Sequence, residues 1–219
     1  MKRNIYIAVS VICVFTAVLV SAALCKAQKR LDMQEKIAGE IIRFHVRANS
    51  DDEADQKLKL KVRNAVISYL EPLLAGSDSI EKSRSIIAGN EFGITATARN
   101  VIVECGFDYD VKAYFERTHF PVRTYGEVTL PAGIYEAYRI DIGSAKGHNW
   151  WCVLYPPLCF EDATHASMTD ESKEALKQVL TEEEYQMITN PQSDICGQDA
   201  TDIKVRFRIL KFLNKYVTQ

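Results

Sequence analysis

The chain opens with basic residues and a long uncharged run, and this combination constrains it more than any other feature. Lys2 and Arg3 precede twenty residues, Ile5 to Leu24, that carry no charged side chain. About 20 apolar residues suffice for a helix to cross a bilayer, and basic residues before such a run are typical of an export signal. The sequence therefore predicts delivery across a membrane, with the basic end on the cytoplasmic side.

The sequence leaves the fate of this leader open. Signal peptidase could cleave after the small-residue motif Val20-Ser21-Ala22, or after the poorer motif Cys25-Lys26-Ala27. The run also exceeds the roughly 7–15 residues of a signal core, so retention as an anchor is the second alternative and a buried core helix the third. We predict a signal peptide or membrane anchor over residues 1–27, a linker or helical stalk over 28–40 and one domain over 41–217.

The exported part is of ordinary size and slightly acidic. Roughly 190 residues are enough for one domain with a single core. Removing three of the 27 Lys and Arg with the leader leaves 24 of them against 29 Asp and Glu. Because a nucleic-acid binder needs a basic face, this balance argues against a nucleic-acid partner.

Apolar periodicity in the first half of the domain predicts one strand followed by helices. Residues 41–48 alternate apolar and polar side chains, which is typical of a strand with one buried face. Residues 52–74 carry apolar side chains at steps of three and four, which indicates a helix whose solvated outer face holds Lys57, Lys59, Lys61 and Arg63. Contact of this basic stripe with anionic lipid headgroups is the alternative. Two further helices are expected over residues 77–90 and 91–105.

The second half begins as a meander of strands and returns to helices. Short alternating segments predict strands between residues 109 and 155, separated by turn residues such as Pro131 and Gly133. Helices are expected over 170–180, 181–188 and 209–216, with a strand over 203–207. The predicted fold class is therefore α+β: a single domain with an antiparallel or mixed sheet packed against several helices, preceded by the N-terminal hydrophobic export or anchor helix.

Four cysteines, Cys105, Cys152, Cys159 and Cys196, belong to the domain, and an exported location permits disulfides. Cys152 and Cys159 flank Pro156-Pro157, which could fold the chain back between them. A Cys152–Cys159 disulfide, two buried free thiols and other pairings all remain alternatives. Because the chain has no Cys-x-x-Cys or paired-histidine spacing, we predict neither a metal nor a cofactor.

The segment from Lys146 to Phe160 is unusually rich in uncommon residues. It holds both tryptophans, two of the six cysteines and one of the four histidines. In a strand, Trp150 and Trp151 point to opposite faces, so we expect one in the core and one available for contact, with two core tryptophans as the alternative. Exposed tryptophans are enriched where interfaces concentrate their binding energy.

A second polar segment, Arg43 to Asp51, is predicted to share a recognition surface with the Gly143–Trp151 loop. His45 is either a polar contact at the edge of this surface or a histidine bonded locally on the sheet. Asn49 and Asp51 are either part of it or only caps of the following helix. The candidate partner-binding residues are Arg43, His45, Asn49, Asp51, His148, Asn149, Trp150 and Trp151.

A thiol hydrolase built on Cys152 with His148 or His45 is the enzymatic alternative, since a thiolate nucleophile needs a nearby base. His148 and Cys152, however, would lie about 13 Å apart along a strand. A thiol that follows two tryptophans in a buried segment is usually inert. We therefore predict that the chain is not an enzyme, and we assign no catalytic residue.

Several motifs resemble those of the stage II sporulation protein R family. The opening motif runs from Arg43 to Asp51 and is followed by Asp55-Gln56, Leu58-Lys59 and Val62-Arg63. Later motifs are Phe120-Pro121, Arg123-Thr124-Tyr125-Gly126, Leu130-Pro131-Ala132-Gly133 and the run from Gly147 to Phe160. The resemblance extends from the leader to about Phe207 and is weakest over residues 164–203.

This resemblance implies a role in endospore formation. Such proteins are made in the forespore and exported into the space between the membranes of the two cells. There they trigger a membrane-bound aspartyl protease, which cleaves the inactive sigma-E precursor. The resemblance thus implies a signal rather than a catalyst; a structural or scaffold protein of the intermembrane space, tethered by Ile5 to Leu24, is the alternative.

Overall fold

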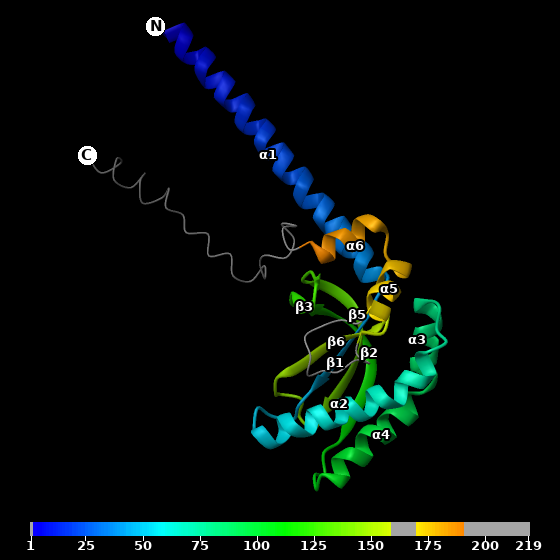
Figure 1. The fold of residues 1–219 in the computed structure, drawn as a ribbon. Helices are drawn as coiled ribbons and strands as arrows, with labels where there is room; N and C mark the ends of the chain where they lie inside the picture. The colour runs from blue at the N-terminus through cyan, green and yellow to red at the C-terminus, as the bar shows by residue number, and fades with distance from the viewer. Residues whose placement is uncertain (1, 159–169, 191–219) are drawn as a thin grey trace, which may run out of the picture.

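The computed structural model describes residues 2–158 and 170–190, and Figure 1 shows the arrangement of their helices and strands. The expected strand over 203–207 and helix over 209–216 lie outside the described residues, as do Cys159 and Cys196. Within the described ranges the predicted α+β fold is confirmed. The elements, in chain order, are α1 (Lys2–Gly39), β1 (Ile42–Arg47), α2 (Glu53–Leu74), α3 (Ile80–Gly89), α4 (Glu91–Glu104), β2 (Val111–Phe120), β3 (Arg123–Tyr125), β4 (Val128–Leu130), β5 (Gly133–Ile142), β6 (Asn149–Tyr155), α5 (Asp170–Val179) and α6 (Glu182–Thr189).

The main sheet is mixed and has the strand order β2-β5-β1-β6. Strand β1 runs parallel to β5 and antiparallel to β6, while β2 and β5 pair antiparallel. Strands β3 and β4 form a separate two-stranded hairpin between β2 and β5. Because β1 lies in the interior of the sheet, its side chains have neighbours on both sides.

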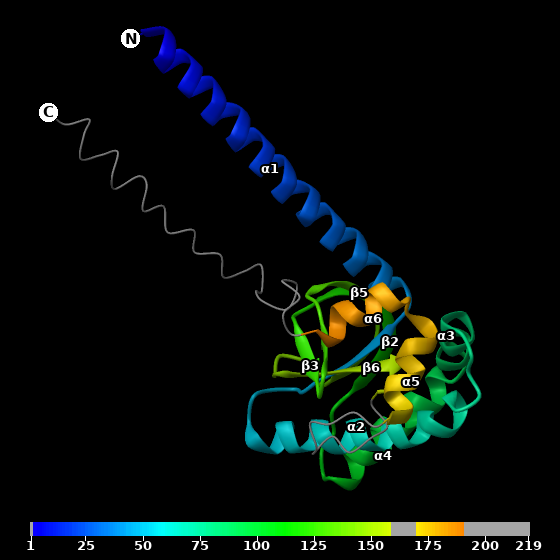
Figure 2. The ribbon, with the colours of Figure 1, turned by 45° about the horizontal axis from the view of Figure 1, so that its top comes forward.

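One face of the sheet packs against α2, α3 and α4, which Figures 1 and 2 show on the same side. Phe44 and Val46 point from β1 into this core and are fully buried. The apolar stripe of α2 meets them, with Val62, Val66 and Leu70 also fully buried. The spacing of three and four that predicted this helix is therefore the spacing that places its side chains in the core.

A second core covers the opposite face near the start of β1. Phe120, Tyr135 and Val153 of the sheet pack there with residues from α5, α6 and the β3–β4 hairpin. The prediction that the strand at 41–48 buries only one face is wrong, because Ile42 to Val46 are all buried. Alternation in the sequence predicted the apolar face of this strand correctly. It could not predict that the second core would also bury the polar face.

Helix α1 joins the apolar leader to the domain without a break. Within it, residues Ser10–Gly39 are long and apolar enough to cross a membrane, a property that signal sequences near an N-terminus share. The last turns belong to the domain: Met33 is buried and Ile37 fully so in the second core. The segment predicted as a linker or helical stalk is therefore helical up to Gly39, and its end packs against the sheet.

Candidate recognition site

Two loops meet at the end of the sheet away from α1. Residues 48–52 follow β1 and residues 143–148 follow β5; we call them the distal loops. Because β1 and β5 are parallel, both loops leave the same edge of the sheet. The amide of Gly147 donates to the carbonyl of Ala48 at 3.0 Å, and the amide of Lys146 donates to that of Asn49 at 3.1 Å. The structure thus brings together the two segments in which the sequence analysis placed a common surface.

Asn49 joins the distal loops through its side chain. Its Oδ1 accepts from the amide of Ser144 at 2.9 Å and from the Ser144 hydroxyl at 3.0 Å. Its Nδ2 donates to Asp55 at 2.8 Å, and the hydroxyl of Ser50 donates to the same carboxylate oxygen at 2.6 Å. Burial raises the pKa of Asp55, but the hydrogen bonds from Ser50 and Asn49 outweigh it and hold the pKa below its ordinary value.

Asp51 holds His148 on the surface. One carboxylate oxygen of Asp51 accepts from the backbone amide of His148 at 2.6 Å and also bonds to the imidazole Nδ1. The side chain of His148 is 78% exposed and that of Asp51 is 55% exposed. The pair therefore presents a fixed imidazole and a carboxylate to solvent, which suits directional recognition by a partner.

The alternative that Asn49 and Asp51 only cap α2 does not match this geometry. The N-cap residue is Asp52, and in the described residues its side chain makes no capping hydrogen bond. Asn49 and Asp51 instead bond to the 143–148 loop. Close approach of the loops depends on two glycines: a Cβ on Gly147 would collide with the carbonyl of Ser50, and Gly143 has a φ of +57° and faces the side chain of Asn49.

Lys59 supports the distal loops from α2, a role that the sequence analysis missed. Its Nζ donates to the carbonyl of His148 at 3.0 Å and to Gln56 at 2.6 Å, while Gln56 donates to the carbonyl of Ser50 at 2.9 Å. Lys59 and Arg63 are buried, so the prediction of a solvated outer face is wrong for these two residues. Burial lowers the pKa of Lys59. The only signal in the sequence was the Asp55-Gln56 and Leu58-Lys59 motif.

The two tryptophans point to opposite faces of β6, as expected. Trp150 meets Phe44 edge to face, with ring centroids 6.0 Å apart, and the guanidinium of Arg63 lies 4.6 Å from its ring centroid. Trp151 stacks on His45 with centroids 5.0 Å apart. Both indoles are half-buried. The expected division into one core and one available tryptophan is therefore not seen, because both indoles pack against neighbouring side chains and both remain partly exposed.

His45 is buried on the face of the sheet opposite α2. Its Nε2 lies 2.9 Å from Glu116, which also bonds to Arg139 at 3.2 Å. Desolvation lowers the pKa of His45 to about 4 although Glu116 acts in the opposite direction, so the imidazole is neutral near pH 7. With an exposed fraction of only 2%, His45 is out of a partner's reach in this conformation.

Arg43 is fully buried at the other end of β1. We call its guanidinium and the three aromatic rings around it, those of Phe120, Tyr125 and Tyr135, the Arg43 chamber. The guanidinium carbon lies 4.4 Å from the ring centroid of Phe120, 5.0 Å from that of Tyr135 and 5.7 Å from that of Tyr125. Nη2 donates to the Tyr125 hydroxyl at 3.0 Å. Nε and Nη1 have no partner in the structure described here. Burial of a cation costs several kcal/mol, and the three aromatic rings offset only part of that cost.

The geometry does not support a catalytic thiol. Cys152 is buried, packs on the helix-facing side of the sheet and is disulfide-bonded. Among the described cysteines Cys13, Cys25 and Cys105 are free, so the alternative of a free thiol at Cys152 is wrong, while a Cys152–Cys159 pair remains one of the possible pairings. His45 lies on the opposite face, and His148 is bonded to Asp51. Cys105 is a free thiol that accepts from Lys61 at 3.5 Å. In the described ranges, no group of three or more His, Cys, Asp or Glu side chains is placed to hold a metal ion.

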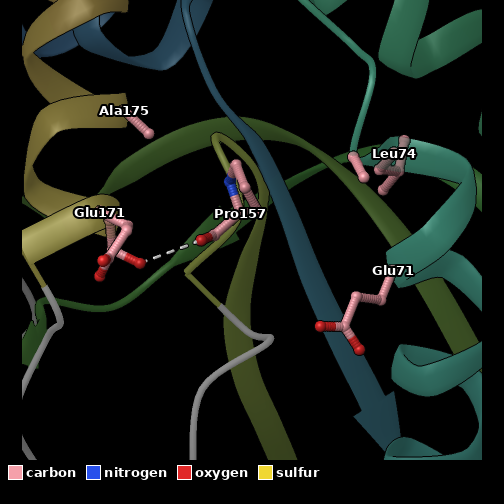
Figure 3. A pocket seen from close by; sticks show the side chains of 7 residues that line it. Glu71, Leu74, Pro157, Glu171 and Ala175 are labelled. Atoms are coloured by element: carbon pink, nitrogen blue, oxygen red, sulfur yellow. Dashed lines mark hydrogen bonds between the residues drawn. The ribbon is translucent and has the colours of Figure 1, made fainter.

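A pocket of about 260 Å³ lies between the end of α2, the start of α5 and the turn at Pro157 (Figure 3). Leu74, Ala75 and Ala175 contribute apolar walls, and Glu71 and Glu171 stand on either side. The hydroxyl of Ser172 donates to the carbonyl of Pro157 at 3.2 Å. A mainly apolar lining without converging buried charges favours the distal loops over this pocket as the recognition site.

Comparison with known proteins identifies the family. The family model described as Stage II sporulation protein R matches residues 38–165, which include every candidate partner-binding residue. The chain is 37% identical over 175 residues to the stage II sporulation protein R of Bacillus subtilis (strain 168), covering 76% of this chain and 78% of that protein. No solved structure matches. With most of both chains aligned at this identity, the protein belongs to the stage II sporulation protein R family.

Proposed function

We propose that this protein is an exported signal of endospore formation that activates a membrane-bound aspartyl protease, which then processes the sigma-E precursor. In this proposal it acts from the space between forespore and mother cell, through contact and without catalysis. Membership of the sporulation family and the N-terminal apolar helix support the proposal.

The observation that carries the proposal is the position of the distal loops relative to α1. Strand β1 starts directly after α1 and ends at the distal loops. Its six residues, at about 3.3 Å each, place these loops roughly 20 Å from the start of the strand. Figure 1 shows α1 leaving the domain at one end and α2 beginning at the other. If α1 stays in the forespore membrane, the loops face away from it, toward a receptor in the opposing membrane.

We assign contact with the protease to the exposed pair Asp51 and His148 of the distal loops and to the half-buried Asn149, Trp150 and Trp151 of the adjoining strand β6. Asn49 positions the loops rather than touching the partner, because its side chain is occupied by Ser144 and Asp55. Tryptophan, with its large rigid surface, is the side chain type most enriched at binding hot spots.

The test is co-expression of the full-length protein with the protease and the sigma-E precursor alone, with cleavage of the precursor as the readout. We expect wild type to provoke cleavage and His148→Ala to reduce it at least about tenfold, the effect of losing one contact worth 1.4 kcal/mol. His119→Ala is the matched control, since His119 is exposed on β2 at the end near α1. Full activity of a stable, exported His148→Ala variant would refute the assignment of the distal loops.

A scaffold of the intermembrane space is the second candidate, because the membrane-length helix would equally tether a structural protein. The same co-expression separates the two. A signal provokes cleavage when only protease and precursor are present, whereas a scaffold leaves the precursor intact and is needed only for assembly of the spore envelope.

A further inference from the structure

The Arg43 chamber poses a problem that the proposed signalling function leaves unsolved. Arg43 has no exposed surface, yet two of its three guanidinium nitrogens lack a hydrogen-bond partner in the described part of the chain. A side chain such as methionine would fill this position without a buried charge. Since a buried charge with unmet donors is not favoured by stability, the chamber points to a ligand.

We propose that the Arg43 chamber is a binding site for a carboxylate carried by an acidic side chain of a protein partner, admitted when the β3 side of the β3–β4 hairpin moves away from Arg43. A guanidinium recognises a carboxylate through two parallel N–H···O hydrogen bonds. Nη2 is adjacent to both Nε and Nη1, and it now donates to the Tyr125 hydroxyl. A carboxylate that displaces this hydroxyl engages Nη2 together with one of the two unmet donors.

The positive charge around the chamber favours a negatively charged ligand. Arg123 lies at its margin, with the guanidinium carbon 5.9 Å from the Trp151 ring centroid, and its positive charge acts on Arg43. Glu116, on the same face of the sheet as His45, is already bonded to His45 and Arg139. Among the described residues the chamber therefore has an excess of positive charge, which a carboxylate would balance.

The β3–β4 hairpin, whose Tyr125 covers Arg43, is suited to opening. The β3–β4 hairpin has strands of only three residues each, and isolated two-stranded hairpins are marginally stable. Val128 and Leu130 of β4 are buried in the second core, whereas Tyr125 of β3 reaches over Arg43. We assign Val128 and Leu130 to the fixed side of the hairpin and Tyr125 to the side that moves.

The proposal is tested by NMR on the full-length chain in detergent micelles, labelled with ¹⁵N-arginine. The Nε–H signal of Arg43 is identified by its loss in Arg43→Met. The probes are sodium acetate, the peptide acetyl-Gly-Glu-Gly-amide and its matched control acetyl-Gly-Gln-Gly-amide. We expect acetate and the Glu peptide to shift the Arg43 signal and the Gln peptide to leave it in place. The Arg63 signal, whose Nε donates to Asn64 at 2.8 Å, reports an intact fold.

Tyr125→Phe sharpens the test, because it keeps the ring but removes the competing hydroxyl. We expect this variant to bind the Glu peptide about three- to tenfold more tightly, the effect of one competing hydrogen bond of ordinary strength. An Arg43 signal that no carboxylate moves, in wild type or in Tyr125→Phe, would overturn the proposal. Equal shifts with the Gln peptide would overturn it too, and a shift with acetate alone would exclude a protein ligand.

The NMR test requires no protease, so its outcome is independent of the signalling proposal. Failure of precursor cleavage in co-expression would leave a carboxylate site at Arg43 standing. Conversely, the Arg43 signal could already have the chemical shift of a carboxylate-bound guanidinium and remain unchanged with every probe. This outcome would mean that a carboxylate of the same chain occupies the site. That result would overturn only the proposal for the chamber.

Discussion

The two ends of β1 use polar side chains in opposite ways. At the distal loops, Asn49 and Asp51 have hydrogen-bond partners, and His148 and Asp51 remain exposed. At the Arg43 chamber, a fully buried cation has unmet donors and three aromatic neighbours. A polar group that stays in contact with water adds little to the free energy of folding. The same group buried among aromatic rings is destabilising unless it has hydrogen-bond partners, and the surrounding apolar packing must then offset that cost. One end of β1 therefore presents polar groups to a partner, whereas the other end encloses a charged group.

Loss of the Phe120 ring tests whether the enclosed end of β1 contributes most to stability. Phe120 is fully buried and packs against Trp151, Tyr135 and Arg43. We expect Phe120→Ala to lower the free energy of unfolding by about 3–5 kcal/mol, because it leaves a cavity and removes a ring above the cation. Urea unfolding measures this, with Phe92→Ala as control because Phe92 is 89% exposed. Equal losses in both variants would remove the distinction between the ends.

A pH titration tests the middle of β1. The pKa of His45 is lowered to about 4 from 6.5, so the unfolded chain binds a proton between these values that the folded chain does not. Stability is therefore lost as pH falls, by about 2 kcal/mol between pH 7 and pH 5 from this group. Urea unfolding at pH 7, 6 and 5 measures the slope. His45→Phe, which keeps an aromatic ring beside Trp151, should lose this part of the slope, and an unchanged slope would contradict the burial of a neutral imidazole.

A smaller loss of stability is expected at the distal loops. Asn49→Ala removes the bonds to Ser144 and Asp55, which we expect to lower the free energy of unfolding by about 1–2 kcal/mol. Asn100→Ala, on the exposed side of α4, is the control and should change it by less than about 0.5 kcal/mol. If Asn49→Ala matched its control, Asn49 would not hold the two loops together.

The smallest effect on stability should accompany the clearest effect on signalling. His148→Ala removes an exposed side chain, so we expect the free energy of unfolding to change by less than about 0.5 kcal/mol. Thermal unfolding of this variant beside His119→Ala would verify that a loss of precursor cleavage reflects recognition. A large loss of stability would instead make His148 part of the fold and would weaken the contrast between the two ends.

Local patterns in the sequence were enough to predict most of the helices and strands. The apolar spacing of Val62, Val66 and Leu70 fixes which side of α2 faces the sheet, and alternation fixes Phe44 and Val46 as core residues. A common surface of the Arg43–Asp51 and Gly143–Trp151 segments was also predicted, from the polar and aromatic side chains that both segments carry. These properties depend on neighbours along the chain or on motifs that span few residues.

Which polar side chains are buried depends on packing between segments that are far apart in the chain. Arg43, His45 and Lys59 look solvent-exposed in the sequence, because a charged or polar residue between apolar ones usually faces water. They are buried because segments distant in the chain cover them: Phe120, Tyr125 and Tyr135 lie over Arg43, Trp151 lies on His45, and the loop at His148 closes over Lys59. Periodicity determines the direction in which a side chain points, whereas its exposure depends on what the rest of the chain places there.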